Sequence, residues 1–383
     1  MAPNPAPPSM TLNEKIGLAL WIIFLAPFKF AFSISRTVWI AWTRGLPLRL
    51  YVSCGFYRVI LADLEPNQIQ AVLPGTIETY RQWIKDVQTS APIGSNGRLD
   101  GKLKEKIEPI TPTSCLLWLG NPATADKIVL SLHGGGYKAP MTPGHLDSCV
   151  QAYMLANPKV EVAVAVLQYT LIPARYPVQL SQAADALAYL LKSGIQPENI
   201  IIGGDSAGSN LTAQLMSHLL HPHPAAKPIE LSRPLLGAFM ISPMVSSDTT
   251  TASYLENDKV DMLSTYIARM DIDAILVGTS YESERRQGKG WAMPLDVDES
   301  WLDGLGRVIQ NLYVSIGQQE VFRSQGIAFA EIVRRRNPDV KLSMHLAPDE
   351  AHNFFFLEGQ IKAFGPATKR MKDWTSSVIS KAG

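Results

Sequence analysis

The stretch that decides the fold is Asn199-Ile-Ile-Ile-Gly-Gly-Asp-Ser-Ala-Gly-Ser-Asn210. It opens with Ile200–Ile202, which has the length and the β-branched content of a buried strand, and it runs into a helical apolar pattern from Ser209 to Leu220. The turn between them carries Gly204-Asp-Ser-Ala-Gly208, a G-x-S-x-G pattern. In a sharp strand-to-helix turn this pattern holds the serine hydroxyl clear of the chain, at the positive end of the helix dipole. The stretch therefore predicts a reactive serine, Ser206.

Strands and helices alternate along the chain from about residue 110 onward, in the manner of βαβ units. The predicted fold class is therefore α/β, with a mostly parallel central sheet flanked by helices. The stretch from about residue 244 to 303 is longer than an ordinary connection, so it predicts an inserted cap. The predicted strands are 114–119, 127–132, 160–168, 200–202, 235–241, 311–316 and 341–346, and the predicted helices are 180–191, 209–220, 322–336 and 365–381.

A second glycine-rich turn follows the predicted strand 127–132, in His133-Gly-Gly-Gly-Tyr137. Glycines leave backbone N–H groups bare, so that a substrate oxygen can approach them closely. The N–H groups of Gly135, Gly136 and Ala207 are predicted to stabilise negative charge on that oxygen, as an oxyanion hole. His133 is predicted to brace this loop rather than to transfer protons.

A serine hydroxyl becomes a good nucleophile only when a neighbouring imidazole removes its proton. His352 lies after the last predicted strand, where this architecture delivers the base. Glu320, just past the preceding strand, is the predicted carboxylate that holds the imidazole in its tautomer. Asp349 and Glu350 compete for that role, but residues so close to His352 in the chain usually cannot fold back onto its ring. The chain order serine, acid, histidine is the α/β-hydrolase order.

These motifs resemble the hormone-sensitive-lipase family of α/β-hydrolases, in particular its fungal esterase and steryl acetyl hydrolase-like branch. The similarity implies an α/β-hydrolase fold with a helical cap, built from N-terminal helices and the inserted segment. It also implies a carboxylic-ester hydrolase in which Ser206, His352 and Glu320 form the triad, with no cofactor. His133, Gly134, Gly204, Asp205 and Gly208 are the motif residues that would support this site. The resemblance covers roughly residues 110–383 and rests on His133-Gly-Gly-Gly-Tyr137, Tyr169-Thr-Leu-Ile-Pro173, Tyr176-Pro177, Gly204-Asp-Ser-Ala-Gly208 and Gly317-Gln-Gln-Glu320.

The chain departs from the family pattern in a few places. Glu320 stands where most of the family has aspartate, and one extra methylene still reaches the same ring nitrogen. Ser324-Gln325 stand where Asp-Glu is common, and Gln182 replaces a usual aspartate. These changes remove structural charges without putting a catalytic role in doubt.

The chain is predicted to have four parts, beginning with a tail rich in proline and alanine. They are a disordered tail over residues 1–12, a hydrophobic segment over 13–45, an N-terminal helical cap region over 46–108, and the catalytic domain over 109–383 with its cap insertion at about 244–303.

The most apolar part of the chain, residues 16–42, leaves three hypotheses open. They are a membrane anchor, an interfacial helix rich in Trp and Phe, and a hydrophobic helix folded over the active site. A membrane span would have to accept Lys29 near its middle, at about 2.5–3.5 kcal/mol, and Pro27 would kink it. The predicted localisation is membrane-associated, with the endoplasmic reticulum as a candidate, or otherwise cytoplasmic. Arginines after the segment place the catalytic part in the cytosol by the positive-inside rule, whereas a resemblance to a lumenal deacetylase points the other way.

Composition argues against several other function classes. The formal net charge is +1, so the chain has no basic surface of the size that a nucleic-acid partner needs. Its 3 cysteines are scattered and indicate thiols in a reducing compartment rather than a disulfide framework. His218, His221 and His223 resemble a metal cluster, but Pro222 and Pro224 keep the last two off a common helical face and no carboxylate or thiol accompanies them, so no metal site is predicted there.

The sequence thus predicts a serine hydrolase that cleaves short-acyl or acetyl esters of an apolar alcohol, such as a sterol or a secondary metabolite. The apolar N-terminus and the Met and Tyr residues of the inserted segment favour such a small apolar substrate. Two alternatives stay open: an acyltransferase or lactone-forming biosynthetic enzyme on the same triad, and a non-catalytic ligand-binding protein on a hydrolase fold. The second is disfavoured because Ser206 and His352 are both present. The sequence does not determine the oligomeric state.

Overall fold

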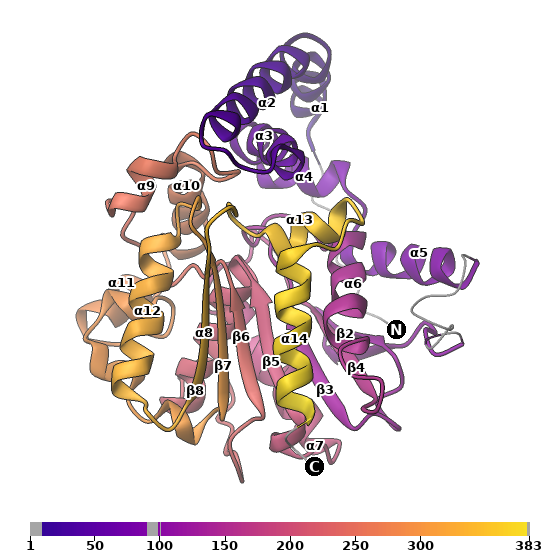
Figure 1. The fold of residues 1–383 in the computed structure, drawn as a ribbon, viewed down its shortest axis with the longest axis vertical. Coiled ribbons are helices and arrows are strands. Elements are labelled where there is room, and N and C mark those ends of the chain that lie inside the picture. The colour runs from indigo at the N-terminus through magenta and orange to yellow at the C-terminus, as the bar shows by residue number, and fades with distance from the viewer. Residues whose placement is uncertain (1–9, 90–98, 100, 381–383) are drawn as a thin grey trace.

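A central β-sheet has helices on both faces and a group of N-terminal helices above one end (Figure 1). The computed structural model describes residues 10–89, 99 and 101–380. The 8-stranded sheet has the order β1-β2-β4-β3-β5-β6-β7-β8. β2 pairs antiparallel with β1 and with β4, and all other neighbours are parallel. The strands are β1 (Ile107–Thr111), β2 (Ser114–Leu119), β3 (Lys127–Leu132), β4 (Val162–Gln168), β5 (Ile200–Asp205), β6 (Gly237–Ile241), β7 (Asn311–Gly317) and β8 (Lys341–Ala347).

The central strands are buried on both faces, which explains their continuous apolar sequences. β4 reads Val-Ala-Val-Ala-Val-Leu-Gln, and each of its residues is buried. β6 begins later than predicted because Leu235 forms only an isolated bridge with Ile309. β1 is absent from the predicted strands, because Pro109 and the half-buried residues around it give an edge strand little sequence signal.

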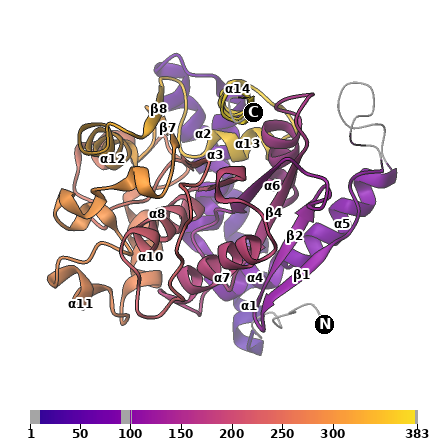
Figure 2. The same ribbon diagram turned by 90° about the horizontal axis from the view of Figure 1, so that it is seen from below.

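Helices cover both faces of the sheet. α6, α12 and α14 lie on one face, and α7 and α8 lie on the other (Figures 1 and 2). α8 begins directly after Ser206, earlier than the predicted start at Ser209. The helices around the sheet are α6 (Pro143–Cys149) with a π-helical continuation η3 (Val150–Met154), α7 (Val178–Lys192), α8 (Ala207–Leu220), α12 (Arg323–Arg336), α13 (Phe354–Gln360) and α14 (Pro366–Ser380).

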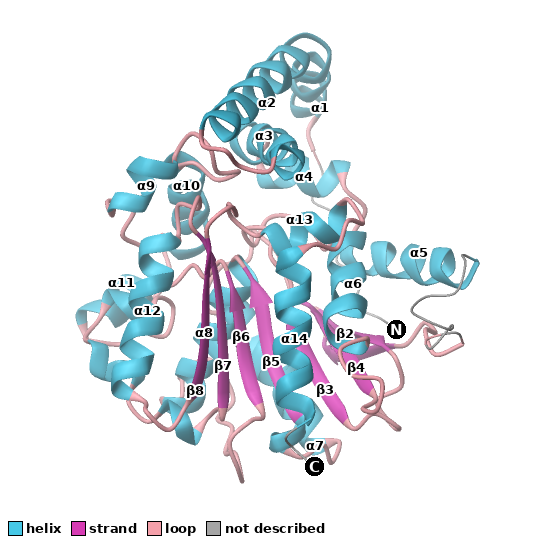
Figure 3. Cartoon of the chain, in the orientation of Figure 1, coloured by secondary structure: helices cyan, strands magenta, loops and turns pink. Residues whose placement is uncertain are grey.

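Two further segments lie over the carboxyl ends of the parallel strands, where the predicted site residues also lie. One is N-terminal and the other connects β6 to β7 (Figure 3). The N-terminal helices are α1 (Leu12–Leu20), the π-helical turn η1 (Trp21–Leu25), α2 (Ala26–Thr43), α3 (Leu48–Asp63), α4 (Pro66–Val72) and α5 (Thr76–Thr89). The inserted segment holds α9 (Ala252–Asn257), α10 (Thr265–Leu276), α11 (Tyr281–Arg286) and short 3-10 turns over Pro294–Asp296, Glu299–Leu302 and Leu305–Arg307.

The predicted disordered tail, residues 1–12, lies mostly outside the described residues. Of its described end, Leu12 begins α1 and Thr11 caps that helix, because the Thr11 side chain accepts from the amide of Glu14 while the Glu14 carboxylate accepts from the amide of Thr11.

The long N-terminal helix, α1 through α2, packs on α3 through its small and polar residues. Ser33 is buried, and its Oγ donates to the carbonyl oxygen of Gly55 at 2.9 Å. Lys29 pairs with Asp63 of α3, Nζ to Oδ2, at 2.5 Å, so its charge is neutralised within the protein. The helical backbone continues through Pro27, because the π-helical turn η1 precedes it. The large apolar side chains of the outer face are exposed: Leu12, Ile16, Leu20, Ile22, Ile23, Phe24, Leu25, Phe28, Phe32, Trp39 and Trp42.

Candidate active site

Ser206 lies on the predicted sharp turn between β5 and α8. Its φ of 54° and ψ of −117° form a strained conformation for a residue with a side chain. The turn is held by its own amide, which donates to the carbonyl of Ile241 at 2.8 Å. A Cβ on Gly204 or Gly208 would lie 2.0 or 1.9 Å from the carbonyl oxygen of Leu132. β3 therefore approaches the turn so closely that only glycine fits on either side of Ser206.

The structure brings His352 to Ser206 from the loop after β8. Nε2 of His352 lies 2.8 Å from Oγ of Ser206. The imidazole is buried and the serine is half-buried. Burial lowers the pKa of His352 to about 3, so the ring is neutral and Nε2 can accept the hydroxyl proton.

Glu320 faces the other ring nitrogen of His352. Its Oε2 lies 3.7 Å from Nδ1, which is longer than a hydrogen bond, and Nδ1 has no hydrogen-bond partner within the described part of the chain. Burial raises the pKa of Glu320, and the hydroxyl of Ser242, which donates to Oε2 at 2.6 Å, opposes that rise. A tightening of roughly 1 Å would close the Nδ1 hydrogen bond, and catalytic contacts often tighten in this way when substrate binds.

The two competing carboxylates are not at the imidazole, and Asp349 is exposed. Glu350 pairs with Arg370 of α14. The hydroxyl of Tyr51 donates to the backbone carbonyl of Asp349 at 3.0 Å, which ties that residue to α3. Of the three carboxylates that the sequence offers, Glu320 is the one at the imidazole.

The glycine loop after β3 presents backbone N–H groups. Gly135 and Gly136 have φ values of 108° and 61°, which turn the loop tightly. Within the described residues, the amides of Gly135, Gly136 and Ala207 donate to no protein acceptor. The amide of Gly134 instead donates to Oδ1 of Asp205 at 3.1 Å, which ties the loop to the serine turn.

His133 braces this loop from behind. Its ring stacks on Tyr169, with centroids 4.4 Å apart, and the Tyr169 hydroxyl donates to the backbone carbonyl of His133 at 2.7 Å. Burial and the neighbouring His145 lower the pKa of His133 to about 4, so its ring is neutral. These contacts support the predicted bracing role.

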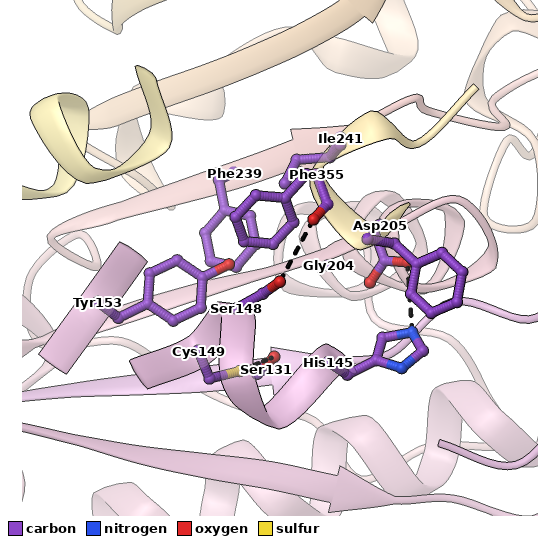
Figure 4. A pocket seen from close by; sticks show the side chains of 11 residues that line it. Ser131, His145, Ser148, Cys149, Tyr153, Gly204, Asp205, Phe239, Ile241 and Phe355 are labelled. Atoms are coloured by element: carbon purple, nitrogen blue, oxygen red, sulfur yellow. Dashed lines mark hydrogen bonds and ion pairs between the residues drawn. The ribbon is translucent and has the colours of Figure 1, made fainter. Parts of the chain in front are cut away.

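Asp205 connects the serine turn to two other loops. Besides Gly134, it accepts from Nδ2 of Asn353, next to His352, at 2.6 Å, and its Oδ2 lies 3.7 Å from Nε2 of His145. Burial alone would raise the pKa of Asp205, but the contacts from His145 and Asn353 lower it below its usual range. Figure 4 shows Asp205 and His145 lining a small pocket of about 10 Å³, which has room for a water molecule and not for a substrate.

The inserted segment contributes contacts that the sequence does not predict. Asp261 accepts from the backbone amides of His352 and Val321, at 2.9 and 2.8 Å, and is buried. Asp271 of α10 pairs with Lys138, next to the glycine loop, at 2.6 Å. Neither carboxylate belongs to a sequence motif, and each contacts a residue far from it in the chain, so only the folded structure reveals them.

A second cavity, of about 250 Å³, lies between the inserted segment and α12. Its lining includes Ser246, Thr251, Leu295, Ser324 and Ile332. None of the predicted site residues lines it, so it is separate from Ser206.

The histidines that resemble a metal cluster in sequence have other partners. His218 contacts the carbonyl of Lys227, His221 contacts that of Trp301, and His223 contacts Glu284 at 3.1 Å. In residues 10–89, 99 and 101–380, no group of three or more His, Cys, Asp or Glu side chains is placed to hold a metal ion. Cys54, Cys115 and Cys149 are free thiols and are buried.

Comparison with known proteins shows which family the chain is similar to. A family described as having the alpha/beta hydrolase fold matches residues 129–356. An esterase from Acinetobacter venetianus is 27% identical over 235 residues, covering 61% of this chain and 69% of the relative. Steryl acetyl hydrolase 1 from Saccharomyces cerevisiae is 31% identical over 109 residues, covering 27% of this chain and 25% of the relative.

The fold has counterparts among solved structures. An esterase from the bacterial hormone-sensitive lipase family superposes with a TM-score of 0.61 and 19% identity, covering 86% of this chain and 98% of that one. Together with the sequence relatives, this confirms the predicted α/β fold class and the resemblance to that family.

Proposed function

The chain belongs to the α/β-hydrolase family and is a carboxylic-ester hydrolase, and on that premise we propose that Ser206, His352 and Glu320 are its catalytic triad. The observation that carries this proposal is the 2.8 Å contact between Nε2 of a neutral His352 and Oγ of Ser206. The unoccupied N–H groups of Gly135, Gly136 and Ala207 support it, because they can receive the charge that develops on the ester oxygen.

The proposed reaction runs through an acyl-enzyme. His352 takes the hydroxyl proton at Nε2 while Oγ of Ser206 attacks the acyl carbon, and the three backbone N–H groups stabilise the resulting oxyanion. The imidazolium then gives its proton to the departing alkoxide. In the second half of the reaction, His352 takes a proton from water, the water oxygen attacks the acyl carbon, and the proton passes to Oγ of Ser206 as the acid leaves. The positive charge on His352 favours the ionised form of Glu320 at this stage, which shortens their contact.

The proposed substrate is a short-acyl or acetyl ester of an apolar alcohol. The similarity to steryl acetyl hydrolase 1 of Saccharomyces cerevisiae supports an acetyl group on a bulky apolar alcohol. Met244, Tyr254 and Met262 of the inserted segment are buried in the hydrophobic core, so the support for an apolar alcohol comes from the sequence relative and not from these side chains.

We also propose that the outer face of the N-terminal helix binds a lipid bilayer. The helix Leu12–Thr43 is long and apolar enough to cross a membrane by length and composition, and 17% of its most apolar 18-residue window is buried. The face of the helix that packs on the protein holds small residues, and its outer face holds exposed Phe and Trp. A helix at the surface of a soluble protein has its large apolar side chains on the packed face instead. Because Lys29 is paired with Asp63 and α2 packs along α3, an arrangement in the plane of the interface fits better than a lone span.

Covalent labelling tests the triad. A fluorophosphonate should modify Ser206 of the wild-type enzyme, Ser206→Ala should abolish labelling, and His352→Ala should slow it by several orders of magnitude. Turnover of p-nitrophenyl esters of rising acyl length should be highest for acetate and decline with longer chains. A wild-type protein that hydrolyses the acetate but labels elsewhere than at residue 206 would remove the proposed nucleophile.

Flotation with phosphatidylcholine vesicles tests the membrane face. The full chain should float with the vesicles, and the triple variant Phe24→Gln, Phe28→Gln and Phe32→Gln should stay in solution. These side chains are 62%, 76% and 67% exposed, so their replacement leaves the packing on α3 intact. Leu346→Gln, on the edge strand β8, is the matched control and should float. Equal flotation of the triple variant and the wild type rules out this face as the lipid contact.

A further inference from the structure

One carboxylate of the inserted segment contacts both loops that carry the proposed base and acid. Asp261 lies between α9 and α10 and is 0% exposed. Its Oδ1 accepts the amide N–H of His352 at 2.9 Å. Its Oδ2 accepts the amide N–H of Val321, the residue after Glu320, at 2.8 Å. The side chain therefore bridges the loop after β8 to the loop after β7.

A second side chain of the same segment, that of Asn257, donates hydrogen bonds to backbone carbonyls of the loop after β7. Nδ2 of Asn257 donates to the backbone carbonyls of Gln318 and Glu320, at 3.0 and 2.9 Å. Asp261 and Asn257 thus satisfy amide and carbonyl groups on either side of Glu320. A buried backbone group without such a partner is costly, so these contacts strongly favour one position of the loop.

The N-terminal helices hold this segment in turn. Nη1 of Arg58, on α3, donates to the backbone carbonyls of Asp261 and Leu263, at 3.0 and 3.3 Å. Nη1 of Arg44 donates to Oδ1 of Asn257 at 3.2 Å. A continuous set of hydrogen bonds therefore runs from α3 through Asp261 to the backbone of His352.

We propose that Asp261 is a positioning residue, which sets the distance between His352 and Ser206 and is itself held by Arg58. This inference rests on the triad proposed above. Asp261 does not touch the substrate or the reacting atoms; it acts through the backbone of the residues that do. A catalytic group displaced by about 1 Å typically loses about 10²-fold in rate.

The position requires a carboxylate and not merely a polar side chain. Two amide donors arrive on separate oxygens, so both oxygens must accept. An asparagine offers one accepting oxygen and one donating NH₂ group. Whichever way its amide turns, one of the two loops loses its acceptor and meets a second donor instead.

The test is kcat per active site, with sites counted by fluorophosphonate titration so that misfolded protein is not counted. Asp261→Asn should lower kcat per site about 10²-fold with KM within about twofold, because binding of the ester is unaffected. Arg58→Gln should lower it less, by about tenfold. Asp273→Asn is the matched control: it lies on α10 of the same inserted segment, its side chain is exposed rather than buried, and it should retain wild-type kcat.

A double variant separates positioning from general destabilisation. In a His352→Ala background, Asp261→Asn should cause little further loss of the residual rate, because the group that it positions is gone. An unchanged kcat per site in Asp261→Asn, or full additivity with His352→Ala, overturns the inference. Loss of titratable sites in the wild type itself would instead overturn the triad, so the two failures are distinguishable.

Discussion

The ion pair between Lys138 and Asp271 joins the cap to the glycine loop, and breaking it on one side should be costly. Nζ of Lys138 lies 2.6 Å from Oδ1 of Asp271, and the two side chains are 4% and 11% exposed. At an effective dielectric constant of about 20, the Coulomb attraction at that distance is about 6 kcal/mol. Desolvation of both ions offsets most of it, so the intact pair contributes little net stability. Lys138→Met leaves the buried carboxylate of Asp271 without its cation, and the expected loss is about 3–5 kcal/mol.

Urea unfolding followed by tryptophan fluorescence measures this loss. Lys138→Met and Asp271→Leu should each be destabilised, and the double variant should recover most of the loss, because apolar replacement of a whole buried pair is close to neutral. Lys227→Met removes a lysine that is 79% exposed and pairs with Asp185, and it should cost less than about 0.5 kcal/mol. If Lys138→Met is no less stable than Lys227→Met, or if the double variant loses the sum of the two single losses, the reasoning is refuted.

Three further predictions concern the catalytic loops. Gly136→Ala should lower kcat about 10²–10³-fold with the protein still folded, because its Cβ would lie 2.7 Å from Oδ2 of Asp271 and would displace an oxyanion donor. Steady-state kinetics measures the rate and a thermal melt checks the folding. An unchanged kcat contradicts the prediction. Ser242→Ala should lower kcat/KM about tenfold, because Glu320 loses its 2.6 Å hydroxyl donor and the amide of Asn353 loses its acceptor at 2.8 Å. Steady-state kinetics measures this, and an unchanged kcat/KM contradicts it. His133 is neutral when folded because burial lowers its pKa to about 4, while the unfolded chain binds a proton below about pH 6.5. Wild-type stability should therefore fall relative to His133→Gln between pH 6.5 and 4, by up to about 1.4 kcal/mol per pH unit in urea titrations, and a pH-independent difference contradicts it.

The sequence predicts the sheet well because its central strands carry strong local signals. β2 and β3 were expected over the residues that form them, since continuous apolar runs between turn residues leave few alternatives. The serine turn is equally local: its glycines, its small residues and the helix after it all lie in one stretch. The edge strand β1 and the short helix α13 carry weaker signals, and pairing and packing decide them.

The residues of the candidate site also differ in whether the sequence alone could identify them. Ser206, His352 and Glu320 could be proposed from motifs and chain order, and the structure brings the first two into contact. Ser242, Asp261 and the Lys138–Asp271 pair could not, because each acts through a contact between distant segments and none has a motif of its own. From the sequence alone, the partner of such a polar residue is unknown, so its role in the site cannot be inferred.

The contacts of Arg44, Arg58 and Asp261 change how a truncation of this protein must be interpreted. A shortened chain that lacks residues 1–45 would lose the apolar outer face, but it would also lose Arg44 and the helix on which α3 packs. Because α3 holds the segment of Asp261 through Arg58, such a chain could lose activity by misplacing His352 without any membrane being involved. Only substitutions confined to the exposed face, such as those at Phe24, Phe28 and Phe32, change lipid contact while leaving that chain of hydrogen bonds intact. A role for the bilayer in catalysis therefore has to be inferred from such variants: their kcat on a water-soluble ester should equal that of the wild type, while turnover of an ester dissolved in vesicles should fall.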